Sequence, residues 1–103
     1  MREIDVAQLE AALRDGASLI DVREPSEYAE GHVPGARHIP MGQLTNRIDE
    51  LDKDAPVHVI CASGNRSGVM VEVLDAAGFE AVNVRGGTSE WARSGREIER
   101  GSK

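Results

Sequence analysis

The chain has 103 residues, of which 40% are hydrophobic and 29% charged, and its formal net charge is −6 at pH 7. This length accommodates a single domain with its own core, and the composition excludes disordered and fibrous proteins. The acidic balance argues against nucleic acid or an anionic membrane as a partner, and the single cysteine excludes an internal disulfide and a cysteine-based zinc cluster.

Residues 1–5 contain no apolar run of the kind found in a signal peptide. The apolar stretches elsewhere are far shorter than the roughly 20 residues that cross a bilayer. We therefore expect the protein in the cytoplasm, where reducing conditions preserve a free thiol.

Helices and strands are predicted to alternate through the first half of the chain. Asp5 predicts the N-cap of a first helix, which Gly16 ends. The segment 18–22 predicts a short buried strand, and 25–29 a helical turn. A loop-rich stretch follows, with a small strand over 37–39.

The second half continues the alternation. Its clearest strand is 57–60, which leads directly into Cys61, and a last strand over 81–84 precedes a short helix over 88–93. Two further helices are indicated by their apolar positions, which are Leu44, Ile48 and Leu51 in the first and Val69, Met70, Val73, Leu74 and Ala77 in the second.

Continuously apolar strands separated by helices predict an α/β fold with a parallel sheet covered on both faces. In such folds ligands bind beyond the carboxyl ends of the strands, and Cys61 stands at such an end. We expect one domain over 5–98, followed by a polar C-terminal tail over 99–103.

The loop after the strand at 57–60 has the composition of an anion-binding site. A lone cysteine is most often a small buried hydrophobe. Here, however, the residues that follow it lie between a strand and a helix, so their backbone N–H groups can turn inward around the thiol and favour a negative charge. Gly64 permits the tight backbone that such a ring needs. We therefore expect the pKa of Cys61 to be lowered, which makes it a nucleophile near neutral pH.

Arg66 adds a positive charge with a planar set of donors, suited to a sulfonate or a similar oxyanion. The alternative is a surface residue in the first turn of a helix, where a cation is not favoured by the helix dipole.

Several segments together resemble a known family. The sequence Cys-Ala-Ser-Gly-Asn-Arg-Ser at 61–67 resembles the active-site loop of single-domain rhodaneses, the thiosulfate sulfurtransferases. Leu-Ile-Asp-Val-Arg-Glu at 19–24 and Gly-His-Val-Pro-Gly-Ala at 31–36 resemble the N-terminal signature of that family, and Val-Arg-Gly-Gly at 84–87 followed by Trp91 its C-terminal one. The resemblance implies a three-layer α/β/α rhodanese-like domain with a five-stranded parallel sheet.

The resemblance also implies a reaction. Cys61 would attack the outer sulfur of thiosulfate or a persulfide donor, and the resulting Cys61 persulfide would pass its sulfur to cyanide or a thiol. Arg66 would contact the oxyanion, and no cofactor or metal is implied. The substrate would be bound by the loop residues Ala62, Ser63, Gly64, Asn65, Arg66 and Ser67. Because the chain has no second cysteine, the persulfide must be handed to an external acceptor, which includes the thiol of another protein.

Other positions receive supporting roles. Asp21 and Arg23 match family positions beside the loop, where they contribute to the charge of the pocket or form an internal ion pair that braces two loops. His32 is expected to be a hydrogen-bonded brace rather than a base, Tyr28 a packing residue with a polar tip, and Trp91 a core anchor.

Two other functions fit parts of the pattern. Cysteine phosphatases and arsenate reductases share the strand–loop–helix arrangement, but they place five residues between Cys and Arg, whereas four separate Cys61 from Arg66. A non-catalytic rhodanese-fold module for binding or regulation is the second alternative. The sequence leaves a monomer and a weak dimer equally open.

Overall fold

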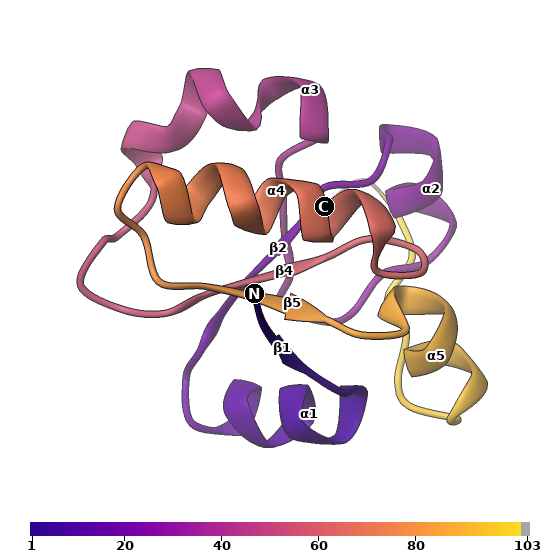
Figure 1. Cartoon of the computed structure of the whole chain (residues 1–103). Helices are drawn as coiled ribbons and strands as arrows, with labels where there is room; N and C mark the ends of the chain where they lie inside the picture. The colour runs from indigo at the N-terminus through magenta and orange to yellow at the C-terminus, as the bar shows by residue number, and fades with distance from the viewer. Residues whose placement is uncertain (102–103) are drawn as a thin grey trace.

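The computed structural model describes residues 1–101, in which strands and helices alternate along the chain (Figure 1). In chain order the elements are β1 (Arg2–Ile4), α1 (Val6–Arg14), β2 (Ser18–Asp21), α2 (Pro25–Glu30), β3 (Arg37–His38), α3 (Met41–Leu44), the 3₁₀ helix η1 (Thr45–Glu50), β4 (Val57–Ile60), α4 (Asn65–Ala76), β5 (Ala81–Val84) and α5 (Gly87–Arg93).

The described strands form one parallel sheet in the order β1-β5-β4-β2-β3. Figure 1 shows α3 and α4 on one face of this sheet and α1 on the other, with α5 beside α1. Strand β4 is central, with Val59 opposite both Ile20 of β2 and Asn83 of β5. The predicted α/β/α arrangement with a five-stranded parallel sheet is therefore confirmed, and Cys61 follows the carboxyl end of the central strand.

Alternation along β4 divides the core into two clusters. Val57, Val59 and Cys61 point to the face covered by α3 and α4, whereas Ile60 points to the other face. The first cluster also contains Ile20, Val22, Ile39, Leu44, Met70, Val71, Leu74, Phe79 and Ala81, and the second contains Val6, Leu9, Leu19, Tyr28, Val33, Ala36, Val84 and Trp91. Because each large aliphatic side chain stabilises the fold by about 1.5–3 kcal/mol when fully buried, the two clusters hold the helices on the sheet.

The first helix begins as predicted. The side chain of Asp5 accepts a hydrogen bond from the backbone N–H of Gln8 (2.8 Å), and the side chain of Gln8 accepts one from the backbone N–H of Asp5 (2.9 Å). This capping box satisfies two donors that the first turn would otherwise leave free, and the loss of such a cap typically costs about 1 kcal/mol.

The structure departs from the prediction at two elements. The helix predicted around Leu44, Ile48 and Leu51 is divided into α3 and the 3₁₀ helix η1. Strand β1 was not predicted, because two of its three residues, Arg2 and Glu3, are charged. As an edge strand it pairs only with β5, and its charged side chains are exposed.

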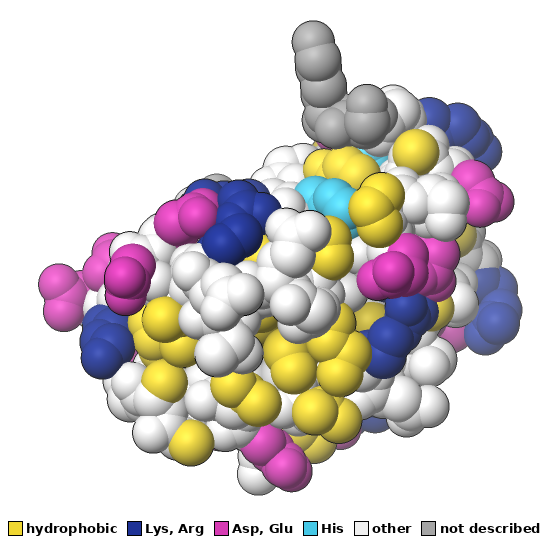
Figure 2. Space-filling model, turned by 90° about the horizontal axis from the view of Figure 1, so that it is seen from above, with side chains coloured by type: hydrophobic (Ala, Val, Ile, Leu, Met, Phe, Trp, Pro, Cys, Tyr) yellow, Lys and Arg dark blue, Asp and Glu magenta, His cyan; other side chains and the backbone are white. Residues whose placement is uncertain are grey.

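The buried face of α4 agrees in part with the predicted one. The residues that face the sheet are Ser67, Met70, Val71 and Leu74, whereas Val69 is 50% exposed. Val73 and Ala77, which were also predicted, pack against the same cluster, so the prediction was wrong at Val69 and missed Ser67 and Val71. Figure 2 shows the side of the molecule that carries α3 and α4, where apolar side chains reach the surface between charged ones.

The C-terminal segment lies against α2. Glu99 and His32 exchange two backbone hydrogen bonds (2.8 and 2.9 Å), and the N–H of Gly101 donates to the carbonyl oxygen of Ala29 (2.8 Å). The predicted tail over 99–103 is thus held in place as far as residue 101, and residues 102 and 103 lie outside the described part of the chain. The domain limits of 5 and 98 stay a prediction.

Candidate active site

The loop that follows β4 turns sharply into α4. Gly64 precedes the first residue of the helix and has φ +106°, a left-handed conformation that favours glycine. This turn brings the start of α4 back over the side chain of Cys61. The 12 residues of α4 make a helix long enough for its N-terminal dipole to favour a negative charge at this position.

Two hydrogen-bond donors face the sulfur of Cys61. The backbone N–H of Gly64 donates to Sγ at 3.1 Å, and the hydroxyl of Ser67 lies 3.3 Å from Sγ as a donor. The side chain is not an inert core filler, although Cys61 exposes only 1% of its surface. The thiol lies at the bottom of a small polar cradle, with its back against the apolar cluster under α4.

Burial and hydrogen bonding act on the thiol in opposite directions. Burial raises the pKa of Cys61, because it disfavours the charged form. Hydrogen bonds lower it, and they come from the Ser67 hydroxyl and from the backbone N–H groups of Ser67, Gly64 and Ser63. Together they outweigh burial, so the pKa of Cys61 lies below its ordinary value, and the cradle favours a thiolate.

Helix α5 closes the outer side of the loop. The N–H of Thr88 donates to the carbonyl oxygen of Cys61 (2.9 Å), and the N–H of Ser89 donates to that of Ala62 (3.0 Å). This approach requires a glycine at position 87, because a Cβ there would collide with the carbonyl oxygens of Cys61 and Ala62. Loop carbonyls are thereby held outward, which leaves the loop N–H groups free to face the sulfur.

Asn83 is a part of the site that the sequence did not indicate. It is 2% exposed on β5, and its Oδ1 accepts a hydrogen bond from the Ser67 hydroxyl (2.5 Å). Its Nδ2 donates to Glu3 Oε2 (2.9 Å) and to the carbonyl oxygen of Gly64 (3.2 Å). A polar residue in the apolar strand 81–84 is the only sequence signal that could have pointed to it.

Arg66 makes an ion pair with Glu27 of α2. Its Nη1 and Nη2 donate to the two carboxylate oxygens at 2.7 and 2.9 Å. Hydrogen bonding from Arg66 lowers the pKa of Glu27 to about 2, and hydrogen bonding to Glu27 raises the pKa of Arg66. The charge of Cys61 also contributes to the raised pKa of Arg66, which places the guanidinium within the electrostatic reach of the thiolate.

The remaining predicted loop residues have exposed or half-buried side chains. Ser63 and Asn65 are exposed, and Ala62 is half-buried. The backbone N–H of Ser63 contributes to the lowered pKa of Cys61. Ala62 acts through its carbonyl oxygen, which anchors the loop on α5.

Asp21 and Arg23 form a buried ion pair. Nη2 of Arg23 lies 2.8 Å from Oδ2 of Asp21, and the same nitrogen donates to the carbonyl oxygen of Gly31 (2.7 Å). Asp21 also accepts a hydrogen bond from the backbone N–H of Arg23 (3.0 Å). The pair joins the end of β2 to the end of α2, as the structural alternative for these two residues predicted.

Two histidines stack on opposite sides of Tyr28. The centroid of the His32 ring lies 3.7 Å from that of Tyr28, and that of His38 lies 4.4 Å away. Nδ1 of His32 lies 2.7 Å from the carbonyl oxygen of Tyr28, and Nε2 of His38 lies 2.8 Å from that of Arg23. These contacts make His32 the brace that the sequence predicted.

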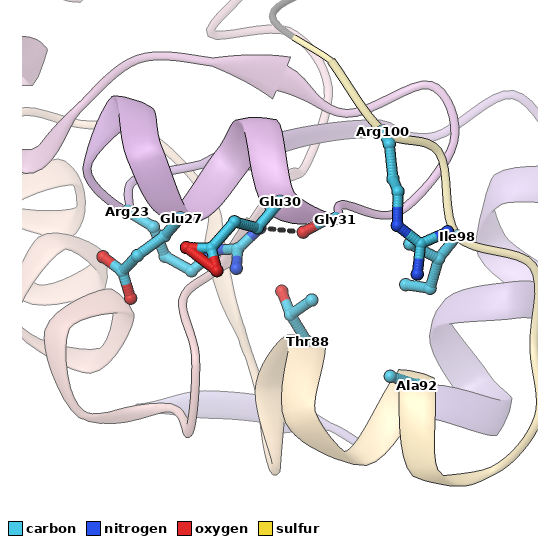
Figure 3. A pocket seen from close by; sticks show the side chains of 8 residues that line it. All are labelled: Arg23, Glu27, Glu30, Gly31, Thr88, Ala92, Ile98 and Arg100. Atoms are coloured by element: carbon cyan, nitrogen blue, oxygen red, sulfur yellow. Dashed lines mark hydrogen bonds between the residues drawn. The ribbon is translucent and has the colours of Figure 1, made fainter.

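A pocket of about 290 Å³ lies beside the cradle, between α2, α5 and the C-terminal segment (Figure 3). Thr88 points its side chain into this space, and its hydroxyl has no hydrogen-bond partner among residues 1–101. The lining residues are Arg23, Glu27, Glu30, Gly31, Thr88, Ala92, Ile98 and Arg100. Thr88 in the pocket lining bonds the carbonyl oxygen of Cys61 through its backbone N–H, and Glu27 bonds the side chain of Arg66. The pocket therefore adjoins both ends of the loop.

Within residues 1–101, no group of three or more His, Cys, Asp or Glu side chains is arranged to hold a metal ion. In the same residues, no helix has the length and apolar character needed to cross a membrane.

Comparisons with known proteins agree on one family. The family described as Rhodanese-like domain matches residues 5–94. A sulfurtransferase of Allochromatium vinosum is 39% identical over 101 residues, which cover 95% of this chain and 94% of that protein. YtwF of Bacillus subtilis is 43% identical over 93 residues, which cover 88% of this chain and 90% of YtwF. The crystal structure of a rhodanese-related protein from Thermoplasma volcanium superposes with a TM-score of 0.90 at 34% identity, covering 96% of this chain and 98% of that one.

Proposed function

This chain belongs to the rhodanese-like domain family, and from that membership and the geometry around Cys61 we propose that it is a sulfurtransferase that carries sulfur as a Cys61 persulfide. The observation that supports this most directly is the sulfur of Cys61 with donors at 3.1 and 3.3 Å. Such a cradle stabilises an anionic sulfur, and the thiolate is the nucleophilic form of cysteine.

The first half of the reaction loads the enzyme. The Cys61 thiolate attacks the outer sulfur of thiosulfate, a bond forms between the two sulfurs, and the bond to the sulfite group breaks with its electron pair. Sulfite leaves, and Cys61 holds a persulfide anion whose charge replaces that of the thiolate. The N–H groups of the loop are available to this anion, because α5 binds the carbonyl oxygens of Cys61 and Ala62 instead.

The second half returns the enzyme to its starting state. Cyanide or a thiolate attacks the terminal sulfur, forms thiocyanate or a new persulfide, and leaves the Cys61 thiolate behind. The acceptor is external, because the chain contains one cysteine. The acceptor class therefore includes thiols on other proteins.

Arg66 is proposed as the contact for the oxyanion of the donor. Its ion pair with Glu27 uses Nη1 and Nη2, and its side chain is 35% exposed, so a donor can approach the guanidinium. A planar guanidinium suits a sulfonate group, which offers several oxygen acceptors. We assign the protein to the cytoplasm, where the Cys61 thiol stays reduced, without a cofactor or metal in the reaction.

Intact mass spectrometry tests the proposal. The protein is incubated with thiosulfate, and we expect an increase of about 32 Da that corresponds to one sulfur on the nucleophile. Cyanide should reverse the increase, and the Cys61→Ser variant should show none.

The same samples separate the alternatives. Hydrolysis of a phosphate ester without a sulfur adduct would replace this proposal with a cysteine phosphatase. Neither an adduct nor hydrolysis would leave a rhodanese-fold module that binds without turnover.

A further inference from the structure

A continuous chain of hydrogen bonds connects β1 with the thiol. Glu3 Oε2 accepts from Asn83 Nδ2 (2.9 Å), Asn83 Oδ1 lies 2.5 Å from the Ser67 hydroxyl, and that hydroxyl lies 3.3 Å from Cys61 Sγ. The inner members Asn83, Ser67 and Cys61 expose at most 2% of their surface. Protein groups, and not solvent, therefore determine where each proton in this series of hydrogen bonds resides.

The neighbours of Asn83 determine the orientation of its amide. Nδ2 faces two groups that only accept, the carboxylate of Glu3 (2.9 Å) and the carbonyl oxygen of Gly64 (3.2 Å). Rotating the amide by 180° would place Oδ1 against both acceptors, which is unfavourable. Oδ1 must therefore face Ser67.

Ser67 has one hydroxyl proton and two acceptors for it. Asn83 Oδ1 accepts it at 2.5 Å, at the short end of the range for a bond between oxygens, whereas Cys61 Sγ is 3.3 Å away. When Cys61 is a neutral thiol, its own proton can be donated to Ser67 Oγ, and every group in the chain is satisfied. When Cys61 is a thiolate, the charged sulfur competes with Asn83 for the Ser67 proton.

We propose that Asn83 is a positioning residue of the site, which holds the Ser67 hydroxyl proton while Cys61 is a thiol and yields it to the sulfur when Cys61 ionises. The inference rests on the proposed role of Cys61 as the nucleophile. Asn83 thus acts on the thiol through Ser67, and it limits how strongly the cradle favours the thiolate, because each ionisation gives up the bond between Ser67 and Asn83.

Charged groups on the surrounding elements can also influence this titration. Glu3 on β1 is the last member of this series of hydrogen bonds, and its Oε1 lies 3.8 Å from Nη1 of Arg85. Arg66 on α4 is paired with Glu27 on α2. On β2, the buried Asp21 is paired with Arg23. The test therefore uses substitutions that change none of these charges.

The test measures the pKa of Cys61 from the pH dependence of its alkylation by iodoacetamide in four proteins. These are the wild type, Asn83→Leu, Ser67→Ala and the double variant. Leucine has nearly the shape of asparagine, so it removes the acceptor while leaving little room for water. Circular dichroism and thermal unfolding establish that each variant is folded.

We expect Asn83→Leu to lower the pKa of Cys61 by roughly 0.5–1, the size of effect that one neutral hydrogen bond supports. Ser67→Ala should raise it, because a donor to the thiolate is lost. The double variant should match Ser67→Ala, since Asn83 has no route to the sulfur without the hydroxyl. A higher pKa of Cys61 in Asn83→Leu than in the wild type would overturn the proposal. So would a change in this pKa on Asn83→Leu that is the same in the wild-type and Ser67→Ala backgrounds.

A second measurement needs no substitution of Asn83. In the wild type, the side-chain carbonyl ¹³C signal of Asn83 should shift as Cys61 titrates, and the shift should be smaller in Ser67→Ala. A signal that stays constant through the titration in the wild type would also overturn the proposal. Alkylation requires no sulfur transfer, so these results are independent of the thiosulfate experiment, and either proposal can fail without the other.

Discussion

Arg66 and Glu27 join the first turn of α4 to α2 through a two-point ion pair, with N–O distances of 2.7 and 2.9 Å. The side chains are 35% and 33% exposed, so the pair lies at the border between the loop and the solvent. Within residues 1–101, Nε of Arg66 has no hydrogen-bond partner, and it remains available to an anion. The pair therefore orients a cation at the site while neutralising part of its charge.

Replacing Arg66 should weaken the binding of an anionic donor. We expect Arg66→Ala to raise the KM for thiosulfate by about 10- to 100-fold, the range for one hydrogen bond to a charged group. Glu27→Gln is the matched control, because it removes the partner and keeps the cation. The KM of Glu27→Gln for thiosulfate should be equal to that of the wild type or lower. Steady-state kinetics measure both, and an Arg66→Ala enzyme with the KM of the wild type would reduce Arg66 to a structural role.

The same pair makes a pH-dependent contribution to stability. The pKa of Glu27 falls from an ordinary value of 4.5 to about 2, chiefly through its hydrogen bond with Arg66. Because the folded-state pKa is depressed, the contribution is fully present above about pH 4.5 and is lost as the pH falls towards 2. Since the pair is partly exposed, we expect at most about 1 kcal/mol.

Urea unfolding of the wild type and Glu27→Gln between pH 2 and 7 measures this contribution. The difference in unfolding free energy should shrink across the acid range. A difference that is independent of pH would contradict the assignment to the Glu27 carboxylate.

The features predicted correctly from the sequence depend on local signals. The capping box of α1 joins residues three apart, and the loop at 61–67 directly follows the strand that positions it. Three apolar residues of four were sufficient to predict β4, because both faces of a central strand are buried.

The features that were missed depend on contacts between distant residues. Asn83 and Glu3 are separated by 80 positions, and Arg66 and Glu27 by 39. Strand β1 exists because β5 offers it backbone partners, which its charged sequence does not reveal. On α4 only Val69 was wrongly placed on the buried face, and Ser67 was missed there because it is a polar residue that is buried beside the thiol.

The close contact between α5 and the loop predicts an unusual sensitivity at Gly87. Gly87 has φ +57°, and a Cβ there would collide with the carbonyl oxygens of Cys61 and Ala62. We expect Gly87→Ala to destabilise the protein by more than about 3 kcal/mol, through backbone strain and the collision. It should also slow alkylation of Cys61, because the loop must shift.

Gly35 provides the control for Gly87. It also has a positive φ of +86°, but a Cβ there meets nothing within 4 Å. Gly35→Ala should therefore cost only the conformational strain, about 1–2 kcal/mol, and leave the reactivity of Cys61 unchanged. Urea unfolding and alkylation rates test the pair. Equal effects of the two substitutions would mean that the contact between α5 and the loop is unimportant.

The buried ion pair between Asp21 and Arg23 predicts non-additive effects on stability. The side chains are 0% and 7% exposed, so Arg23→Leu leaves an uncompensated carboxylate in the interior. The expected loss is about 3–5 kcal/mol, measured by urea unfolding. The double variant Asp21→Asn, Arg23→Leu removes both charges and should lose clearly less stability than Arg23→Leu alone, because no unpaired charge is then buried.

Thiosulfate kinetics of the double variant distinguish a structural brace from a source of charge for the pocket. A brace predicts a KM close to that of the wild type, since Arg66 is unchanged, whereas a KM raised tenfold or more would show that Arg23 contributes directly to donor binding.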